Sequence, residues 1–224
     1  MQKRQVQTGR PKEATPMIQP DARSRFTPDD VALVLRLTSG AGDDEDFDRR
    51  LDRPELVREL PGAPVPGPSP SLYFYVLVRQ SLREHGVMDR RVADYCAALL
   101  RDFGERDRAQ RIAPVDDHRH RYLIDIVADA SSAQGDRQFR VLVHLGNYAL
   151  WVAGVYPRWI SARRERRGGP DLSYYDAMGT RGFAEASDHW MASRVGLEDV
   201  FRTTADHFSE VRLALNDLSA KLAA

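Results

Sequence analysis

The sequence predicts an all-α protein, a helical bundle of about six or seven helices over residues 71–224. Apolar residues after position 70 recur at spacings of three and four, which is the one-sided pattern of helices packed on a core. The stretch from His144 to Gly169 is the most apolar and aromatic in the chain, and it ends in the densest arginine cluster. The final stretch, 197–222, carries an apolar heptad run.

The N-terminal region is predicted to lie outside this bundle. Residues 1–25 are polar and basic without apolar periodicity, so we expect a disordered arm. A short helix is predicted within 26–39, because Thr27 is a good N-cap and Pro28 suits the first helical position.

A long insert separates this short helix from the bundle. Residues 40–70 begin with a cluster of five acidic residues and continue with six prolines. Proline-rich segments favour extended, semi-rigid conformations. We therefore predict a linker, with at most a short helix around Leu51–Leu60.

The first part of the bundle is predicted from periodicity and from glycine stops. Leu72–Val78 alone has the composition of a buried strand, but its continuation to Gly86 favours a helix. Cys96 lies on the apolar side of the next helical pattern, so a buried position is expected. The helices predicted here cover 70–86, 92–103 and 122–130.

The segment that begins near Asp136 is predicted to be the central helix. Its apolar residues surround the helix, and small residues such as Gly146 and Gly154 permit close approach by neighbours. Pro157 should kink or end this helix, and a further turn or two is expected as far as Arg167.

Two helices complete the predicted bundle. Asp171 can cap a helix that ends near Gly196, and one continuous helix follows. Its seam is wide, which favours packing within the bundle; a seam shared between two copies is the alternative. The seam residues are Leu197, Phe201, Thr204, Phe208, Val211, Leu215, Leu218 and Leu222.

Composition narrows the function classes. The 33 basic and 33 acidic residues of the 224-residue chain cancel, so no global field draws it to nucleic acid or to a membrane. The basic residues are 30 Arg and only 3 Lys, which we attribute to a GC-rich coding sequence. A single cysteine excludes an internal disulfide and a cysteine-based zinc site. Without a secretory signal or an 18-residue apolar run, we expect a cytoplasmic protein with no membrane partner.

The aromatic residues and arginines of the stretch from His144 to Gly169 suggest ligand binding. Arginines could bind phosphates while neighbouring rings stack on bases. Alternatively, the arginines interact with the partial negative charge of a helix C-terminus, and the aromatic rings belong to the core. The acidic cluster of the insert would then neutralise the charge of the arginines. The candidate ligand-binding residues are His144, Tyr148, Trp151, Arg158, Arg163, Arg164, Arg166 and Arg167.

No catalytic residue, metal site or cofactor is predicted. A lone histidine such as His144 in an apolar helix is more often a core residue than a catalyst. Di-iron bundles need Glu-x-x-His on two helices, but Ala186 and Thr204 stand three residues before His189 and His207.

Three hypotheses of function follow. The first is a non-enzymatic interaction, adaptor or regulatory protein, with a protein partner or a second copy bound through the 197–222 seam or the 28–38 helix. The second is an anion- or nucleic-acid-binding module that uses Arg158–Arg167, with nucleic acid less favoured. The third is a helical enzyme or cofactor or metal binder with a pocket near His144.

Overall fold

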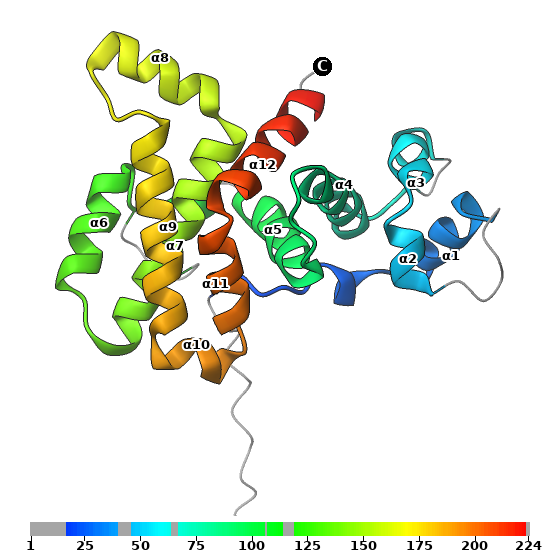
Figure 1. Cartoon of the computed structure of the whole chain (residues 1–224), viewed down its shortest axis with the longest axis horizontal. Coiled ribbons are helices and arrows are strands. Elements are labelled where there is room, and N and C mark those ends of the chain that lie inside the picture. The colour runs from blue at the N-terminus through cyan, green and yellow to red at the C-terminus, as the bar shows by residue number, and fades with distance from the viewer. Residues whose placement is uncertain (1–16, 40–45, 64–66, 106, 114–118, 223–224) are drawn as a thin grey trace, which may run out of the picture.

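The computed structural model of the chain describes residues 17–39, 46–63, 67–105, 107–113 and 119–222. In these ranges it contains α-helices, short 3-10 turns and no β-strand, which confirms the all-α class (Figure 1). The first helices are α1 (Pro28–Leu37), α2 (Phe47–Leu51), α3 (Pro54–Glu59), α4 (Pro70–Glu84) and α5 (Arg90–Phe103). The others are α6 (Leu123–Ser132), α7 (Gly135–Val155), α8 (Pro157–Arg167), α9 (Leu172–Asp188), α10 (Trp190–Val195), α11 (Glu198–Asp206) and α12 (Phe208–Leu222).

The central helix is α7, as the sequence predicts. It is buried on nearly all sides from Phe139 to Gly154, and it packs on α6, α9 and α12. On the other side of the molecule α4 packs on α5 and α12 (Figure 1). Cys96 in α5 is buried, as expected.

Helices α7 and α9 approach each other at backbone distance. A Cβ atom placed on Gly182 would lie 2.7 Å from the backbone nitrogen of Gly146 and 2.9 Å from the carbonyl oxygen of Leu142. A Cβ atom on Gly146 would in turn lie 2.8 Å from the ring of Phe183. Only glycine fits at these two positions, so the two backbones touch.

The N-terminal segment differs from the predicted arm. Of residues 1–25, those before Met17 lie outside the described residues, whereas 17–25 run across the bundle to α1 (Figure 1). Ile18 is 2% and Ala22 1% exposed, and both belong to the apolar core. We call residues 17–26 the N-terminal strap.

The short helix α1 begins as the sequence predicts. The Thr27 side chain accepts a hydrogen bond from the Asp30 backbone, and Pro28 occupies the first turn. Asp30 also accepts a hydrogen bond from the backbone N–H of Ser69 at 2.8 Å, which ties α1 to the start of α4. Leu33 and Val34 are buried, so α1 belongs to the fold.

The insert is more helical than the extended linker that its prolines suggest. In its described parts, α2, α3 and a 3-10 turn bury Leu51, Leu56 and Leu60 in the core. Pro54 occupies the first turn of α3, where a missing N–H costs no hydrogen bond. The acidic residues 43–45 and three residues of the proline-rich part, 64–66, lie outside the described residues.

The described part of residues 70–224 holds nine helices, α4 to α12, and not six or seven. The helix predicted from Asp171 to Gly196 divides at His189, and the one predicted over 197–222 divides at His207. The main packing partners change at His207: α11 packs mainly on α9 and less on α5, whereas α12 packs mainly on α7 and α4 and less on α9.

The heptad seam packs inside the molecule. Its members from Leu197 to Leu218 are at most 3% exposed, and only Leu222 is half exposed. The expected packing within the bundle is confirmed, and the seam therefore offers a second copy little surface beyond Leu222.

Gly182→Ala should destabilise the fold by about 2 kcal/mol or more, because the added methyl group meets backbone atoms that cannot move independently. Urea unfolding followed by circular dichroism measures this loss. Gly62→Ala is the control: nothing lies within 4 Å of its Cβ position, so a change within about 0.5 kcal/mol is expected. Equal midpoints for both variants would contradict the backbone contact.

Candidate functional site

The three predicted site residues of α7 do not share one pocket. His144 lines a cavity of about 10 Å³, Tyr148 a pocket of about 360 Å³, and Trp151 a groove of about 450 Å³. Each of these three hollows is thus lined by only one of the three predicted residues.

His144 is a core residue in this structure. Its side chain is 3% exposed, and the ring centroids of Phe103, His120 and Tyr148 lie 6.0, 6.1 and 6.2 Å away. Burial, aided by the positive charge of Arg108 and by His120, lowers the pKa of His144 to about 3. The imidazole is thus neutral at pH 7, and its cavity has room for about one water molecule.

The pocket at Tyr148 has the chemistry of a binding site, and we call it the aromatic–arginine pocket. It lies between the start of α6, the middle of α7, the exposed helix α8 and the start of α9. Most of its wall is aromatic or aliphatic. Its lining residues are Arg121, Tyr122, Leu123, Ile124, Tyr148, Trp159, Arg163, Pro170, Tyr174 and Tyr175.

Arg163 is held in this pocket by aromatic stacking. Its guanidinium carbon lies 4.6 Å from the ring centroid of Tyr122 and 5.2 Å from that of Trp159. Stacking of a cation on ring faces is attractive, and it leaves the N–H groups at the edge of the guanidinium available. No carboxylate of the described residues forms an ion pair with Arg163.

The turn after α8 also fixes Arg163. Gly168 has φ +62°, the left-handed conformation that ends many helices, and it reverses the chain. Gly169 then packs on Arg163, since a Cβ atom on Gly169 would lie 3.2 Å from the Arg163 Cγ. The long side chain is therefore restrained before any ligand binds.

Tyr148 forms a neutral part of the wall. Its hydroxyl donates a hydrogen bond to the Arg121 carbonyl oxygen at 3.0 Å, and its side chain is buried. Burial, with a smaller contribution from Tyr175, raises the pKa of Tyr148 to about 12 although Arg163 opposes the rise. Burial likewise raises the pKa of Tyr175.

The predicted arginine cluster does not form one patch. Arg158 lines a different hollow, and Arg164 pairs with Asp171 at 2.9 Å. Arg166 and Arg167 are exposed beyond the pocket. Of the five arginines only Arg163 enters the aromatic–arginine pocket.

Of the lining residues, only Tyr148 and Arg163 were predicted as site residues, because sequence reasoning singled out one stretch of chain. Arg121 and Tyr122 lie just before α6, far from Arg163 in the sequence, whereas Tyr174 and Tyr175 come from α9, the helix that follows α8. No local pattern could join them to Arg163, because their proximity depends on how α6 and α9 pack on α7.

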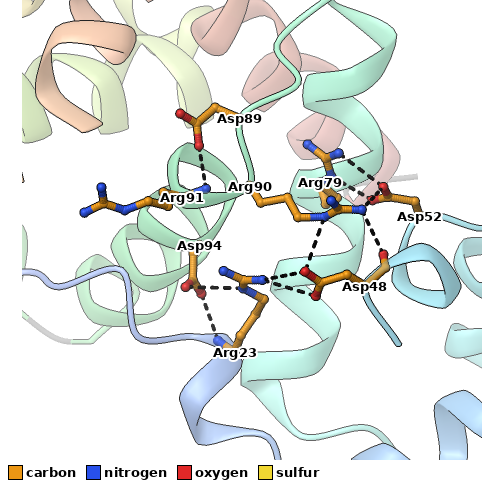
Figure 2. A network of polar contacts seen from close by, with 8 residues as sticks. All are labelled: Arg23, Asp48, Asp52, Arg79, Asp89, Arg90, Arg91 and Asp94. Atoms are coloured by element: carbon orange, nitrogen blue, oxygen red, sulfur yellow. Dashed lines mark hydrogen bonds and ion pairs between the residues drawn. The ribbon is translucent and has the colours of Figure 1, made fainter. Parts of the chain in front are cut away.

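The densest charged cluster is a structural clamp (Figure 2). Arg79, which is 4% exposed, binds Asp52 at 2.7 Å, and Arg90 reaches the same carboxylate at 2.6 Å. Burial alone would raise the pKa of Asp52, but the hydrogen bond and charge of Arg79 outweigh burial and lower it. Three arginines thus meet three aspartates, and together they join the strap, α2, α4 and α5: Arg23, Arg79, Arg90, Asp48, Asp52 and Asp94.

Comparisons with known proteins give no further guide to this chain. No family model, no curated protein and no solved structure matches it. Across the described ranges, no three His, Cys, Asp or Glu side chains gather as metal ligands. No described helix has the length and apolar character needed to span a bilayer.

Asp52→Ala should lower the free energy of unfolding by about 3 kcal/mol, because it leaves the buried guanidinium of Arg79 without its carboxylate. Asp199→Ala is the control, since Asp199 is 83% exposed and lies 3.9 Å from Arg91. Its removal should cost less than about 1 kcal/mol. Urea unfolding at pH 7 compares them, and equal losses would contradict a structural clamp.

Stability should also depend on pH through His144. The folded pKa of about 3 lies below the unfolded value of about 6.5. Below pH 6.5 the unfolded chain takes up a proton that the folded chain refuses, so stability is lost as pH falls toward 3. Between pH 7 and 4.5 the wild type should lose roughly 2–3 kcal/mol more than His144→Gln.

Urea unfolding at the two pH values measures this difference. His207→Gln is the control because His207 is exposed, and it should lose as much stability as the wild type. If His144→Gln also behaves like the wild type, His144 is not the neutral buried group described above.

Proposed function

We propose that this protein is a non-enzymatic binding protein whose ligand is a small anion that carries an aromatic ring. The observation that supports this most is Arg163, stacked between Tyr122 and Trp159 in a pocket and without an ion-pair partner in the described chain. A ligand would supply both the negative charge and the ring that this arrangement accommodates.

The anionic group is supported by the state of Arg163. A guanidinium binds a carboxylate or phosphate through parallel hydrogen bonds, and its planar fork is well suited to them. The rings and Gly169 restrain the side chain, so little conformational entropy is lost on binding. Arg121 lies on the exposed rim and adds a second positive charge.

The aromatic part of the ligand is supported by the wall of the pocket. Tyr174, Tyr175 and Ile124 provide ring faces and aliphatic surface beside Arg163. The volume of about 360 Å³ falls in the range of small-molecule sites. Aromatic rings gain from offset or edge-to-face contact with such walls.

Binding without chemistry is supported by what lines the pocket. The lining residues include no carboxylate, imidazole or thiol that could act as general base or nucleophile. The Tyr148 hydroxyl donates a hydrogen bond to a carbonyl oxygen and has a raised pKa. It therefore stays protonated at pH 7 and cannot act as a general base.

Nucleic acid is a weaker candidate for the ligand. Proteins that bind it track several phosphates with a continuous basic surface. Here the chain has no net charge, and Arg158, Arg163 and Arg164 diverge toward different surroundings. A single restrained arginine suits one anionic group.

A protein partner is the second candidate. Tyr122, Ile124 and Trp159 are 46%, 58% and 45% exposed beside Arg163. Tyrosine, tryptophan and arginine are enriched at the energetic centres of interfaces. An acidic and aromatic segment of a partner would use the same contacts, and the role would then be that of an adaptor.

Arg163→Ala should weaken binding of small aromatic anions about tenfold, since a charge-assisted hydrogen bond is lost. Benzoate and phenyl phosphate are the probes, and the indole N–H resonance of Trp159 reports their binding by NMR titration. Benzyl alcohol, which has the ring without the charge, should bind more weakly than either anion.

Arg166→Ala is the matched control, because Arg166 is exposed on the same helix and does not line the pocket. It should leave the affinity unchanged. Equal weakening by both variants, or binding that does not perturb Trp159, would refute the aromatic–arginine pocket as the site. Binding of acidic aromatic peptides but not of either small probe would favour the protein partner.

A further inference from the structure

We propose a second site, distinct from the aromatic–arginine pocket, that binds an acyl chain with an anionic head group. It is the groove of about 450 Å³ between α4, α5, α7 and α12, which we call the apolar groove. Its wall is almost entirely hydrocarbon and aromatic ring. The lining residues are Phe74, Leu100, Gly104, Trp151, Val155, Tyr156, Leu215, Leu218, Ser219 and Leu222.

The apolar groove is open to solvent although its wall is apolar. Tyr156 is 49% and Leu222 50% exposed, and Trp151 is partly buried beside them. The rings of Trp151 and Tyr156 meet edge to face with centroids 5.6 Å apart, and Phe103 supports Trp151 from behind at 6.0 Å. Exposed apolar surface that is hollowed and held rigid indicates a binding site.

A polar hollow of about 530 Å³ adjoins the groove and shares Val155, Tyr156 and Ser219 with it. This hollow adds Arg158, which is exposed and has no ion-pair partner among the residues that the structure describes. Among the residues that the structure describes, no carboxylate lines either hollow. An apolar surface that ends beside a lone positive charge is complementary to an amphiphile with a negative head.

The shortage of free polar atoms favours an acyl chain over an extended peptide. The Ser219 hydroxyl donates to the Asn216 carbonyl oxygen, and the Asn216 amide donates to the Ala153 and Gly154 carbonyl oxygens at 2.7 Å. An extended peptide would bring backbone groups that need partners in the groove, and burying them unpaired is costly. An acyl chain brings none.

Isothermal titration with octanoate, decanoate and dodecanoate, each below its micelle concentration, tests the proposal on the full chain. Binding should be saturable with one site, and affinity should rise about fourfold for each methylene that enters the groove. Arg158→Ala should weaken dodecanoate roughly two- to fivefold and leave dodecanol unchanged.

Two variants locate the site. Ser219→Phe fills the groove and should abolish most dodecanoate binding; Leu222→Glu, at the exposed end, should weaken it without disturbing the core. Leu213→Glu is the matched control, because Leu213 is 42% exposed on the same helix and lines neither hollow. Arg163→Ala should not alter dodecanoate binding, so the two proposed sites can fail separately.

Three results would overturn the proposal: affinity independent of chain length, binding that survives both Ser219→Phe and Leu222→Glu, or binding seen only above the micelle concentration. Analytical ultracentrifugation provides a further test. A dimer that Leu222→Glu dissociates would make the groove an interface between two copies, which also contradicts an acyl-chain site.

Discussion

The backbone contact between Gly146 of α7 and Gly182 of α9 is the constraint on which the bundle depends. Because neither glycine has a side chain, α9 lies against α7 at backbone distance, and Phe183 covers Gly146. That approach holds α9 against α7, while Asp171 caps the start of α9, and Tyr174 and Tyr175 line the pocket beside Tyr148. The aromatic–arginine pocket is therefore a consequence of close helix packing.

The arginines divide into two groups by their surroundings. Those of the clamp lie among aspartates in a partly buried network, where a missing partner would be costly. They hold the strap and α2 against α4 and α5, so residues that look like a linker in sequence become part of the fold (Figure 2). Arg163 instead has aromatic neighbours and no such carboxylate in the described ranges. In a chain with no net charge, this local difference is more informative than the number of arginines.

Sequence patterns predicted those features that depend on residues near each other along the chain. The cap at Thr27, the buried Cys96 and the central helix follow from neighbours along the chain, and the structure confirms them. The break at His207 could not be predicted, because the heptad run continues through it and the change of main packing partners there is visible only in the fold. The site shows the same limit. Tyr148 and Arg163 were named from one segment, whereas Tyr122 enters from a helix that the segment cannot place.

Helix α8 links the two proposed sites. Ile160 is its one fully buried side chain within the described structure, so the bundle itself holds α8 weakly. Trp159 lines the aromatic–arginine pocket with one part of its surface and the polar hollow at Arg158 with another. A ligand at either place would restrain the same helix. The conformational entropy that α8 loses when one ligand binds need not be lost again when the other binds. Positive coupling between the sites is then expected to be reciprocal, with each ligand raising the affinity for the other by the same factor.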